Sequence, residues 1–411
     1  MNFKISKKSK KSQARLGFME TPHGVVETPC LVPVATQAVV KTLASEEVEK
    51  TNSQILICNT FHLHLRPGEK FVEKAGGLHK FMNWKKPLMT DSGGFQIFSL
   101  GFGKDFNTGK VLKSTRNYTE SYTELRRKND EFSIKKGSQP RNVKITQDGV
   151  YFKSPVDGVK LFFGPKDSIK IQEKLRADII FAFDECTSPI ADYQYTKKSL
   201  NKTHQWAKVC LKVKKSLRLS SGQAHQSLFG IVQGGKYKDL RKESAKFIGG
   251  LEFDGFGIGG EFGSDKNLMP KMLDWVISEL PEKKPRHLLG IGYLKDIEKI
   301  IKSGIDLFDC TVPTHYARRG IAFIHPHTKR SYGVGARRWA INLRQAKFLN
   351  NREPLDKNCV CNVCLNYKKN YICHLLRAGE LTALKLLTFH NLYYFNNFVG
   401  EIKVKIKNGE I

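Results

Sequence analysis

Short apolar runs recur along the chain, and each ends near glycine, threonine, asparagine, aspartate or glutamine. Strands that are buried on both faces read as continuous apolar runs, and parallel neighbours need a helical crossover between them. Eight such runs predict a (β/α)8 barrel, although a doubly wound open sheet fits the same periodicity. The runs are Cys30–Val34, Ile55–Cys58, Pro87–Thr90, Asp178–Phe183, Leu228–Val232, Gly255–Ile258, His287–Ile291 and Ile305–Phe308.

Two of the links between these runs carry clear helix signals. Ser45–Lys50 begins with a residue type that caps helices and continues with two acids, which favour a helix start. Lys295–Lys302 is amphipathic and stops close to Gly304. We therefore expect helices over both segments.

The link between the third and fourth runs is roughly eighty residues long, which exceeds the usual strand-to-helix spacing. Its last part, Val143–Phe163, predicts a hairpin. The earlier part, 104–142, is polar with mixed charge and reads as a long insertion after strand 3, in which Tyr118–Phe132 could form a lone helix. Two interpretations stay open: a mobile insertion, or an extra arm for nucleic acid.

The remaining segments suggest three domains. Residues 1–27 predict a small β element with Gly17 and Gly24 as turn signals, 28–320 the barrel, and 321–411 a helical subdomain with a cysteine cluster. No apolar run reaches the roughly 18 residues that a membrane span needs. The basic N-terminus lacks the apolar core of a secretory signal. The cytoplasm is therefore the expected compartment.

The charge balance is strongly basic, with 69 Lys and Arg against 39 Asp and Glu, for a formal net charge of +30. That excess exceeds what solubility requires and favours a polyanionic partner such as nucleic acid. A lysine-rich solvated surface is the alternative explanation.

Four of the nine cysteines cluster near the C-terminus. Cys359, Cys361 and Cys364, with His390 further along, offer three thiolates and one imidazole, the full tetrahedral shell of a structural Zn2+ site. The alternative is three reduced surface cysteines beside an unrelated histidine. Cys373 and His374 are interpreted as helix residues, because the first set already fills four ligand positions.

Polar residues follow five of the eight apolar runs: Asp91, Asp184, Gln233, Gly259–Gly260 and Asp309. In a barrel these positions share the C-terminal mouth, where substrates bind. Each one alone could be a helix cap, a structural acid or a tight turn. Together, acids, an amide and exposed backbone N–H groups suit a purine-like edge, and one carboxylate could attack an anomeric carbon while another moves protons.

These motifs resemble those of the tRNA-guanine transglycosylases, over about residues 14–400 apart from the insertion. The stretch from Leu375 to Glu380 matches as well. The other segments that carry the resemblance are Asn59–Leu63, Leu65–Gly68, Asp91–Gln96, Phe183–Cys186, Val232–Gly235, Phe308–Cys310, His390–Phe395 and the C-x-C-x2-C…His set.

The resemblance implies a barrel with a zinc subdomain that exchanges guanine at the tRNA wobble position for a 7-deazaguanine base, in queuosine biosynthesis. It implies Asp309 as the nucleophile that forms a covalent ribosyl-enzyme, Asp91 as general acid/base, and a homodimer. Since the archaeal relatives have a further C-terminal RNA-binding domain, the wobble-base type is expected here. The other implied roles are base binding by Asp184, Gln233, Gly260, Phe95, Ser92 and Leu289, tRNA binding by His315, Arg318 and Arg319, and zinc binding by Cys359, Cys361, Cys364 and His390.

The sequence departs from the family pattern at a few positions. Where the family has a Gly-Gly-Leu segment, this chain has Gly-Gly-Glu-Phe-Gly-Ser-Asp at residues 259–265. His315 stands where relatives usually have an arginine that contacts the anticodon. Gly263 matches members that accept queuine, whereas Cys186 matches members that use preQ1, so the incoming base stays open.

Two other functions compete with the enzyme. A non-catalytic tRNA-binding accessory subunit should lack a catalytic carboxylate, but this chain keeps both Asp91 and Asp309. A barrel glycosidase that acts on free sugars is disfavoured by the net charge of +30 and by the predicted zinc cluster.

Overall fold

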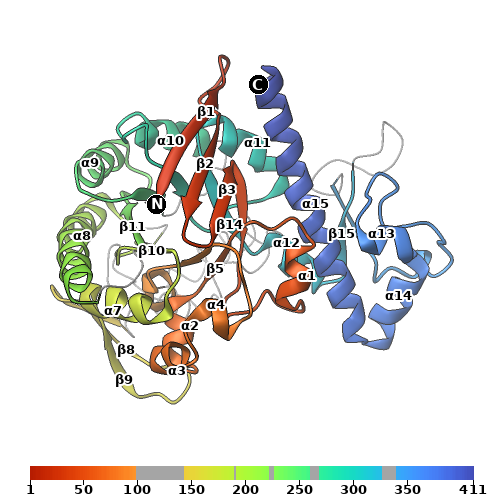
Figure 1. The fold of residues 1–411 in the computed structure, drawn as a ribbon, viewed down its shortest axis with the longest axis horizontal. Coiled ribbons are helices and arrows are strands. Elements are labelled where there is room, and N and C mark those ends of the chain that lie inside the picture. Colours follow the sequence, from red (N-terminus) through yellow and green to blue (C-terminus); the bar gives the residue numbers. More distant parts are fainter. Residues whose placement is uncertain (99–142, 189–190, 222–225, 260–267, 326–338) are drawn as a thin grey trace, which may run out of the picture.

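A closed parallel barrel forms the centre of the protein (Figure 1). The computed structural model describes residues 1–98, 143–188, 191–221, 226–259, 268–325 and 339–411. Within these residues, eight parallel strands run in the order β4-β14-β13-β12-β11-β10-β6-β5, and a bridge between Val34 and Ile57 joins the two ends. The (β/α)8 prediction is confirmed. The strands are β4 (Cys30–Pro33), β5 (Leu56–Cys58), β6 (Leu88–Thr90), β10 (Ile179–Phe181), β11 (Ser227–Val232), β12 (Gly255–Ile258), β13 (Arg286–Leu288) and β14 (Leu307–Cys310).

Most barrel strands are apolar on both faces because both faces are covered. Val32, Ile57, Met89 and Phe181 belong to one buried cluster, which fills the barrel interior. Their chain neighbours, such as Leu31, point outward into a larger cluster against the surrounding helices. This double burial explains why the strands are recognisable in the sequence as continuous apolar runs.

The helices largely follow the predicted links. The second predicted helix is α11, which begins one residue early at Leu294 and ends before Gly304 (φ +89°). The first predicted helix is α1, but Ser45 is not its cap: Ala44 holds that position, and the Ser45 hydroxyl donates to the Met82 carbonyl instead. The helices associated with the barrel are α1 (Ser45–Glu49), α2 (Thr60–Leu65), α3 (Glu69–Lys74), α4 (Leu78–Phe81), α7 (Pro165–Leu175), α8 (Tyr193–Ser221), α9 (Lys238–Gly249), α10 (Met269–Ile277), α11 (Leu294–Lys302) and α12 (Val312–Ala317).

An antiparallel sheet of β1 (Asn2–Lys8), β2 (Arg15–Thr21) and β3 (Gly24–Thr28) precedes the first barrel strand. Gly24 begins β3 at φ +126°, as a turn signal should, but Gly17 lies inside β2. A Cβ atom at Gly17 would come within 2.8 Å of the Lys4 carbonyl oxygen, so this glycine allows close packing of β1 and is not a turn residue.

A buried ion pair fastens this sheet to the barrel. Arg15 and Asp306 are almost fully buried and form two hydrogen bonds of 2.8 and 2.6 Å. Asp306 also accepts from the backbone N–H of Arg286 at the start of β13. Breaking one partner of such a pair typically costs about 3–5 kcal/mol, because the remaining charge stays buried.

The long link after β6 ends in an antiparallel sheet of three strands, β7 (Val143–Ile145), β8 (Val150–Lys153) and β9 (Lys160–Phe163). The sequence predicted only a hairpin over Val143–Phe163, and the strand that it missed is β8, which lies between the two predicted arms. Residues 104–142, including the helix predicted over Tyr118–Phe132, lie outside the described residues.

After the barrel come a two-stranded sheet, β15 (Ile321–Phe323) and β16 (Ala340–Asn342), and the helices η2 (Ala346–Phe348), α13 (Asn362–Asn366), α14 (Lys369–Ala378) and α15 (Leu381–Asn408). Cys373 and His374 lie in α14, as expected.

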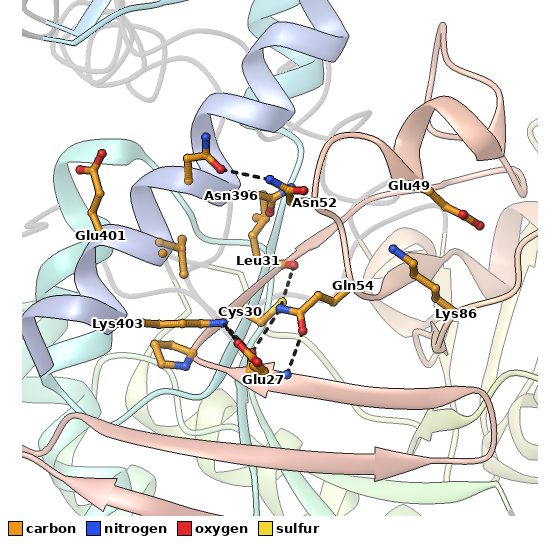
Figure 2. A pocket seen from close by; sticks show the side chains of 14 residues that line it. Glu27, Cys30, Leu31, Glu49, Asn52, Gln54, Lys86, Asn396, Glu401 and Lys403 are labelled. Atoms are coloured by element: carbon orange, nitrogen blue, oxygen red, sulfur yellow. Dashed lines mark hydrogen bonds and ion pairs between the residues drawn. The ribbon is translucent and has the colours of Figure 1, made fainter. Parts of the chain in front are cut away.

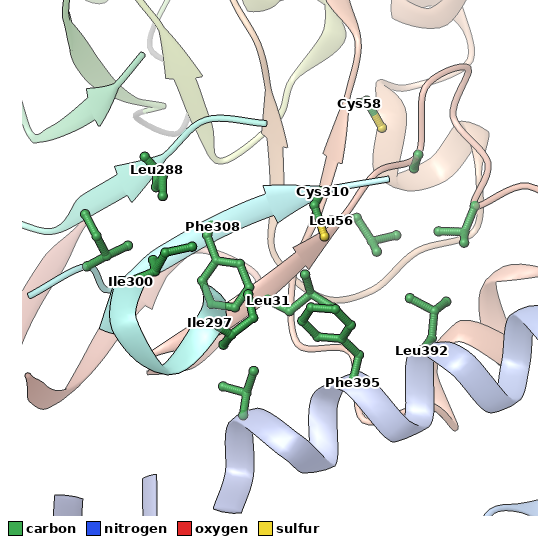
Figure 3. Close-up of a cluster of buried hydrophobic side chains, with 14 of the residues drawn as sticks. Leu31, Leu56, Cys58, Leu288, Ile297, Ile300, Phe308, Cys310, Leu392 and Phe395 are labelled. Atoms are coloured by element: carbon green, nitrogen blue, oxygen red, sulfur yellow. The ribbon is translucent and has the colours of Figure 1, made fainter. Parts of the chain in front are cut away.

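The last helix, α15, packs along the barrel seam between β14 and β4. Figure 3 shows Leu392 and Phe395 of α15 beside Phe308 of β14 and Leu31 of β4. Within the described residues, no helix has the length and apolarity that a membrane crossing requires.

Candidate active site and metal cluster

The predicted polar strand ends do meet at one mouth of the barrel. Asp91 follows β6, Gln233 follows β11, and Asp184 lies three residues beyond β10. Asp309 lies within β14, which continues to Cys310. Gly259 follows β12, whereas Gly260 lies outside the described residues. Parallel strands place all of these C-terminal ends on the same side of the barrel.

Asp91 is held by donors from the start of α2. Its carboxylate accepts from the Thr60 backbone N–H (2.9 Å), the Asn59 side-chain amide (2.5 Å) and the Gly93 backbone N–H (3.2 Å). Burial and, to a smaller extent, the nearby negative charge of Asp309 outweigh these hydrogen bonds and raise the pKa of Asp91 to about 7. A carboxyl group with a pKa near neutrality can both donate and accept a proton.

Asp309 is placed differently, although it lies close enough for its charge to act on Asp91. Its side chain is 14% exposed, and one carboxylate oxygen meets the His287 Nε2 atom at 2.9 Å and the Gly290 backbone N–H at 3.0 Å. These two hydrogen bonds to one oxygen orient the carboxylate. Its other oxygen accepts no hydrogen bond from the described residues. This arrangement suits a nucleophile.

His287 is a site residue that the sequence analysis did not single out. It is fully buried on β13, packs edge-on against Phe181 at 5.4 Å between ring centroids, and touches Asp309. Its Nδ1 atom has no hydrogen-bond partner among the described residues. The Nε2 atom therefore carries the ring's one polar contact, which fits an Nε2–H donor to Asp309.

Asp184 and Gln233 form a buried polar pair. The Gln233 amide donates to Asp184 at 2.6 Å, and the Ser92 hydroxyl donates to the other carboxylate oxygen at 3.1 Å. Burial raises the pKa of Asp184 to about 6 despite these bonds. The Gln233 Oε1 atom is buried without a partner in the described structure, and an unsatisfied acceptor of this kind is costly unless a ligand supplies a donor.

Two further predicted base-binding residues follow strand ends of the barrel. Phe95 follows Gly94 and is 46% exposed, so part of its ring is accessible to a ligand. Leu289 is half-buried and contacts the residues of the barrel interior. Gly94 allows the close approach of the two loops, because a Cβ atom there would come within 2.8 Å of the Asp184 carbonyl oxygen.

The predicted tRNA-binding residues lie on or just after α12, which begins three residues beyond Asp309. His315 and Arg318 are half-buried, and Arg319 is exposed. Arg318 donates to the Thr314 carbonyl at 2.9 Å, and burial together with the charge of Arg319 lowers its pKa. Helix α12, which carries or precedes these three residues, directly follows the strand of Asp309.

The four predicted metal ligands converge as well. Cys359, Cys361, Cys364 and His390 are buried, with all four ligand atoms within 4.8 Å of one another. The His390 Nδ1 atom lies 3.8, 3.4 and 3.3 Å from the three sulfur atoms. A tetrahedral shell with zinc–ligand distances of about 2.0 and 2.3 Å separates nitrogen and sulfur by about 3.5 Å, so the set fits a metal ion.

The surroundings of His390 support the same fit. Its Nε2 atom lies 2.7 Å from the Phe323 carbonyl oxygen, which accepts the ring proton and leaves Nδ1 free to bind a metal. The neighbouring Asn391 accepts from the Phe323 N–H and donates to the carbonyls of Pro313 and Ile321. The cluster is therefore tied through α15 to helix α12 beside the mouth.

A second group, His23, His79 and Asp178, also brings potential ligand atoms together. The two imidazoles stack in nearly parallel planes with centroids 3.5 Å apart, so their nitrogen lone pairs run parallel and do not point at a common centre. Burial would raise the pKa of Asp178, but hydrogen bonds from both histidines outweigh it and hold that pKa low. Since Asp178 lies at the start of β10, away from the mouth, we interpret this group as structural.

A cavity of about 680 Å³ opens between α15 and the segment from β3 to β4 (Figure 2). Its lining includes Glu27 and Lys403, which bridge at 3.5 Å, and Gln54, which bonds the Glu27 backbone. Burial raises the pKa of the lining Cys30 thiol to about 11, so this thiol is not a nucleophile at neutral pH. The cavity lies at the N-terminal end of β4, away from Asp91 and Asp309.

Comparison with known proteins gives a consistent result. The family described as queuine tRNA-ribosyltransferase matches residues 9–129 and 127–411, two segments that meet within the predicted insertion. A queuine tRNA-ribosyltransferase of Caldanaerobacter subterraneus subsp. tengcongensis is 40% identical over 412 residues, covering 100% of this chain and 95% of the relative. A protein of the same name from Natranaerobius thermophilus is 40% identical over 407 residues, covering 99% and 95%.

These matches, over a barrel with two carboxylates at its mouth, show an enzyme of the pentosyltransferase class. More narrowly, the chain belongs to the queuine tRNA-ribosyltransferase family.

Proposed function

We propose that this protein exchanges guanine at the wobble position of tRNA anticodons for a 7-deazaguanine base, either preQ1 or queuine. The observation that carries the proposal is the contrast between the two carboxylates at one mouth. Asp91 has a pKa of about 7, whereas Asp309 is oriented by His287 and by the Gly290 backbone. Such a division separates proton transfer from nucleophilic attack.

The reaction proceeds in two displacements. First, an Asp309 carboxylate oxygen attacks the ribose anomeric carbon, the glycosidic bond to guanine breaks, and protonated Asp91 gives its proton to the leaving base. A covalent ribosyl ester on Asp309 results. The incoming base then attacks the same carbon, its ring proton passes to Asp91, and the ester bond breaks. Two inversions retain the configuration at that carbon.

The buried pair Asp184 and Gln233 reads the base. The carboxylate accepts from ring and amino N–H groups, and the unpartnered Gln233 Oε1 atom supplies a further acceptor. Phe95 stacks on the base, while Ser92 and Leu289 border it. Gly260 completes the proposed set by a backbone contact. Assays with labelled preQ1, queuine and guanine decide which incoming base is used.

The tRNA is held by electrostatic attraction around the mouth. The net charge of +30 suits a polyanion, and His315, Arg318 and Arg319 lie on or just after α12, which follows Asp309 in the chain. We further propose a homodimer and a cytoplasmic location. A non-catalytic accessory subunit remains the alternative, but it would have no use for a carboxyl group whose pKa is about 7 beside a second, oriented carboxylate.

We also propose that the metal is one Zn2+, bound by Cys359, Cys361, Cys364 and His390. Three thiolates and one imidazole are a typical closed zinc shell, which supplies folding energy and no open position for substrate. The cluster holds α15 against β15 through His390 and its neighbour Asn391.

Trapping the ester tests the chemistry. Wild-type protein with labelled tRNA and a 7-deazaguanine base should give a covalent adduct on a denaturing gel. Asp309→Ala should give neither adduct nor exchange, and Asp309→Asn should also fail, because the amide has nearly the same shape but is a poor nucleophile. An adduct that persists in Asp309→Ala and vanishes in Asp91→Ala would reverse the two roles.

A further inference from the structure

The sheet of β7, β8 and β9 has an unusual outer face. Its inner face is apolar and buried, with Phe152 and Phe163 packed toward the barrel. The outer face combines two exposed aromatic rings with lysines, and we call it the lysine–aromatic face. Its residues are Lys144, Tyr151, Lys153, Lys160 and Phe162.

The strand register places these side chains side by side. Tyr151 pairs with Lys144 on one side and with Phe162 on the other, and Lys153 pairs with Lys160. The Tyr151 and Phe162 rings are 37% and 38% exposed, with centroids 4.8 Å apart. The Lys160 Nζ atom lies 5.0 Å from the Tyr151 ring centre.

The charge of this face is uniformly positive. The three strands contain no acidic residue, and the acids of the segment, Asp148 and Asp157, lie in the turns between them. Among the described residues, none of the three lysines has an ion-pair partner. Flat aromatic surface with unneutralised lysines is the combination that binds unpaired nucleotides, by stacking on bases and attracting phosphates.

The face lies one sheet away from the proposed reaction centre. Phe152, on the inner side, contacts Phe61 of α2 at 5.5 Å between ring centroids. Thr60, the neighbour of Phe61, donates its backbone N–H to Asp91. Gly93 approaches the Phe163 ring so closely that a Cβ atom there would lie 3.3 Å from it. The inner side of this sheet therefore lies close to the residues that hold Asp91.

We propose that the lysine–aromatic face is a second docking surface for the tRNA substrate, which stacks unpaired nucleotides on Tyr151 and Phe162. This inference rests on the proposed function, since it takes tRNA as the substrate. The simpler explanation is that Tyr151 and Phe162 only stabilise a small sheet as a cross-strand pair. That explanation predicts a change in stability but no change in tRNA affinity.

The first experiment removes the rings and keeps apolar bulk. The double variant Tyr151→Leu with Phe162→Leu should raise the KM for tRNA by roughly five- to a hundredfold, the range expected for lost base stacking. The KM for the 7-deazaguanine base and the turnover at saturating tRNA should not change. A KM for tRNA within twofold of wild type would overturn the proposal.

The chain offers a matched control at the other end of the barrel. Phe18 on β2 is 41% exposed and pairs across the strands with the exposed Lys4, again on a three-stranded antiparallel sheet. β1, β2 and β3 lie well apart from β8 and β9 in Figure 1. Phe18→Leu with Lys4→Gln should leave tRNA affinity unchanged, and an equal loss in this control would also overturn the proposal.

A second experiment uses the wild-type protein and so does not depend on a variant that folds. Bound tRNA should protect Lys144, Lys153 and Lys160 from an amine-reactive label by at least severalfold, whereas Lys4 should react equally with and without tRNA. If the three lysines are already unreactive in the free protein, another part of the chain or a second copy covers the face, and the proposal fails.

The salt dependence of binding adds an independent measurement. Changing all three lysines to glutamine should lower the slope of log affinity against log salt by about 2, since each contact with a single strand contributes about 0.7. If wild-type protein shows no adduct and no base exchange, the proposed function fails instead. Protection of the three lysines by tRNA would then still show whether the lysine–aromatic face binds tRNA.

Discussion

Replacing Asp91 with asparagine should make the protein more stable and inactive at once. A pKa of about 7 in the folded protein, against an ordinary value of 3.8, means that folding disfavours the charged form. Between these two pKa values the folded state binds more protons than the unfolded state. Stability is therefore lost as the pH rises from about 4 to 7, and the loss is complete above 7.

The size of the effect follows from the shift. About three pKa units correspond to roughly 4 kcal/mol at 1.36 kcal/mol per unit. This is a ceiling, because Asp91 is partly accessible from the mouth and solvent screens part of the penalty. Asp91→Asn removes the penalty, so its stability advantage over wild type should grow by up to about 2–3 kcal/mol between pH 5 and pH 8.5.

Urea denaturation of both proteins at several pH values measures this difference, with base exchange assayed in parallel. Asp309→Asn serves as the matched control, since it removes the negative charge that raises the pKa of Asp91. In that background the pH-dependent advantage of Asp91→Asn should shrink. A stability difference that does not vary with pH would refute the assignment of a raised pKa to Asp91, and with it the physical basis for its role as acid and base.

The other predictions concern the metal and the orientation of the nucleophile. Elemental analysis should find about one zinc per chain, and Cys361→Ser should lose both the metal and much of its thermal stability; zinc-free native protein would contradict this. His287→Phe should slow adduct formation by roughly ten- to a hundredfold with little change in the KM for tRNA, because the mutant loses one hydrogen bond to a charged group. His287→Gln, which can keep a hydrogen-bond donor, should slow adduct formation less than His287→Phe does. An equal slowing in the two variants would show that His287 acts only through packing.

The barrel was predictable because its strands are buried on both faces, which leaves continuous apolar runs such as Ile305–Phe308 in the sequence. The candidate site was predictable for a related reason. Parallel strands present their ends together, so Asp91 and Asp309 had to share a mouth once the barrel was assumed. The metal cluster was predictable because three of its ligands lie within six residues of one another, from Cys359 to Cys364.

The features that the sequence did not reveal depend on contacts between distant residues. His287 begins an apolar run, where a single histidine has no distinguishing pattern, and its proposed role depends on Asp309, twenty-two residues away. Arg15 and Asp306 are separated by 291 residues. Gly17 was misinterpreted as a turn because glycine serves turns and close strand packing equally well, and only the position of Lys4 distinguishes the two.

The seam covered by α15 has a consequence for how the protein is made. Ribosomes synthesise the chain from the N-terminus onward, at roughly 5–20 residues per second. The barrel cannot close before its last strand, β14, has been made. Phe308 on β14 and Leu31 on β4 then stay uncovered until Phe395 is synthesised, 87 residues later (395 − 308). For roughly 4–17 s the newborn barrel thus exposes an apolar strip along its last-formed edge. Truncation before α15 should make this strip permanent and yield aggregates, even though every barrel strand and both carboxylates at the mouth, Asp91 and Asp309, would be present.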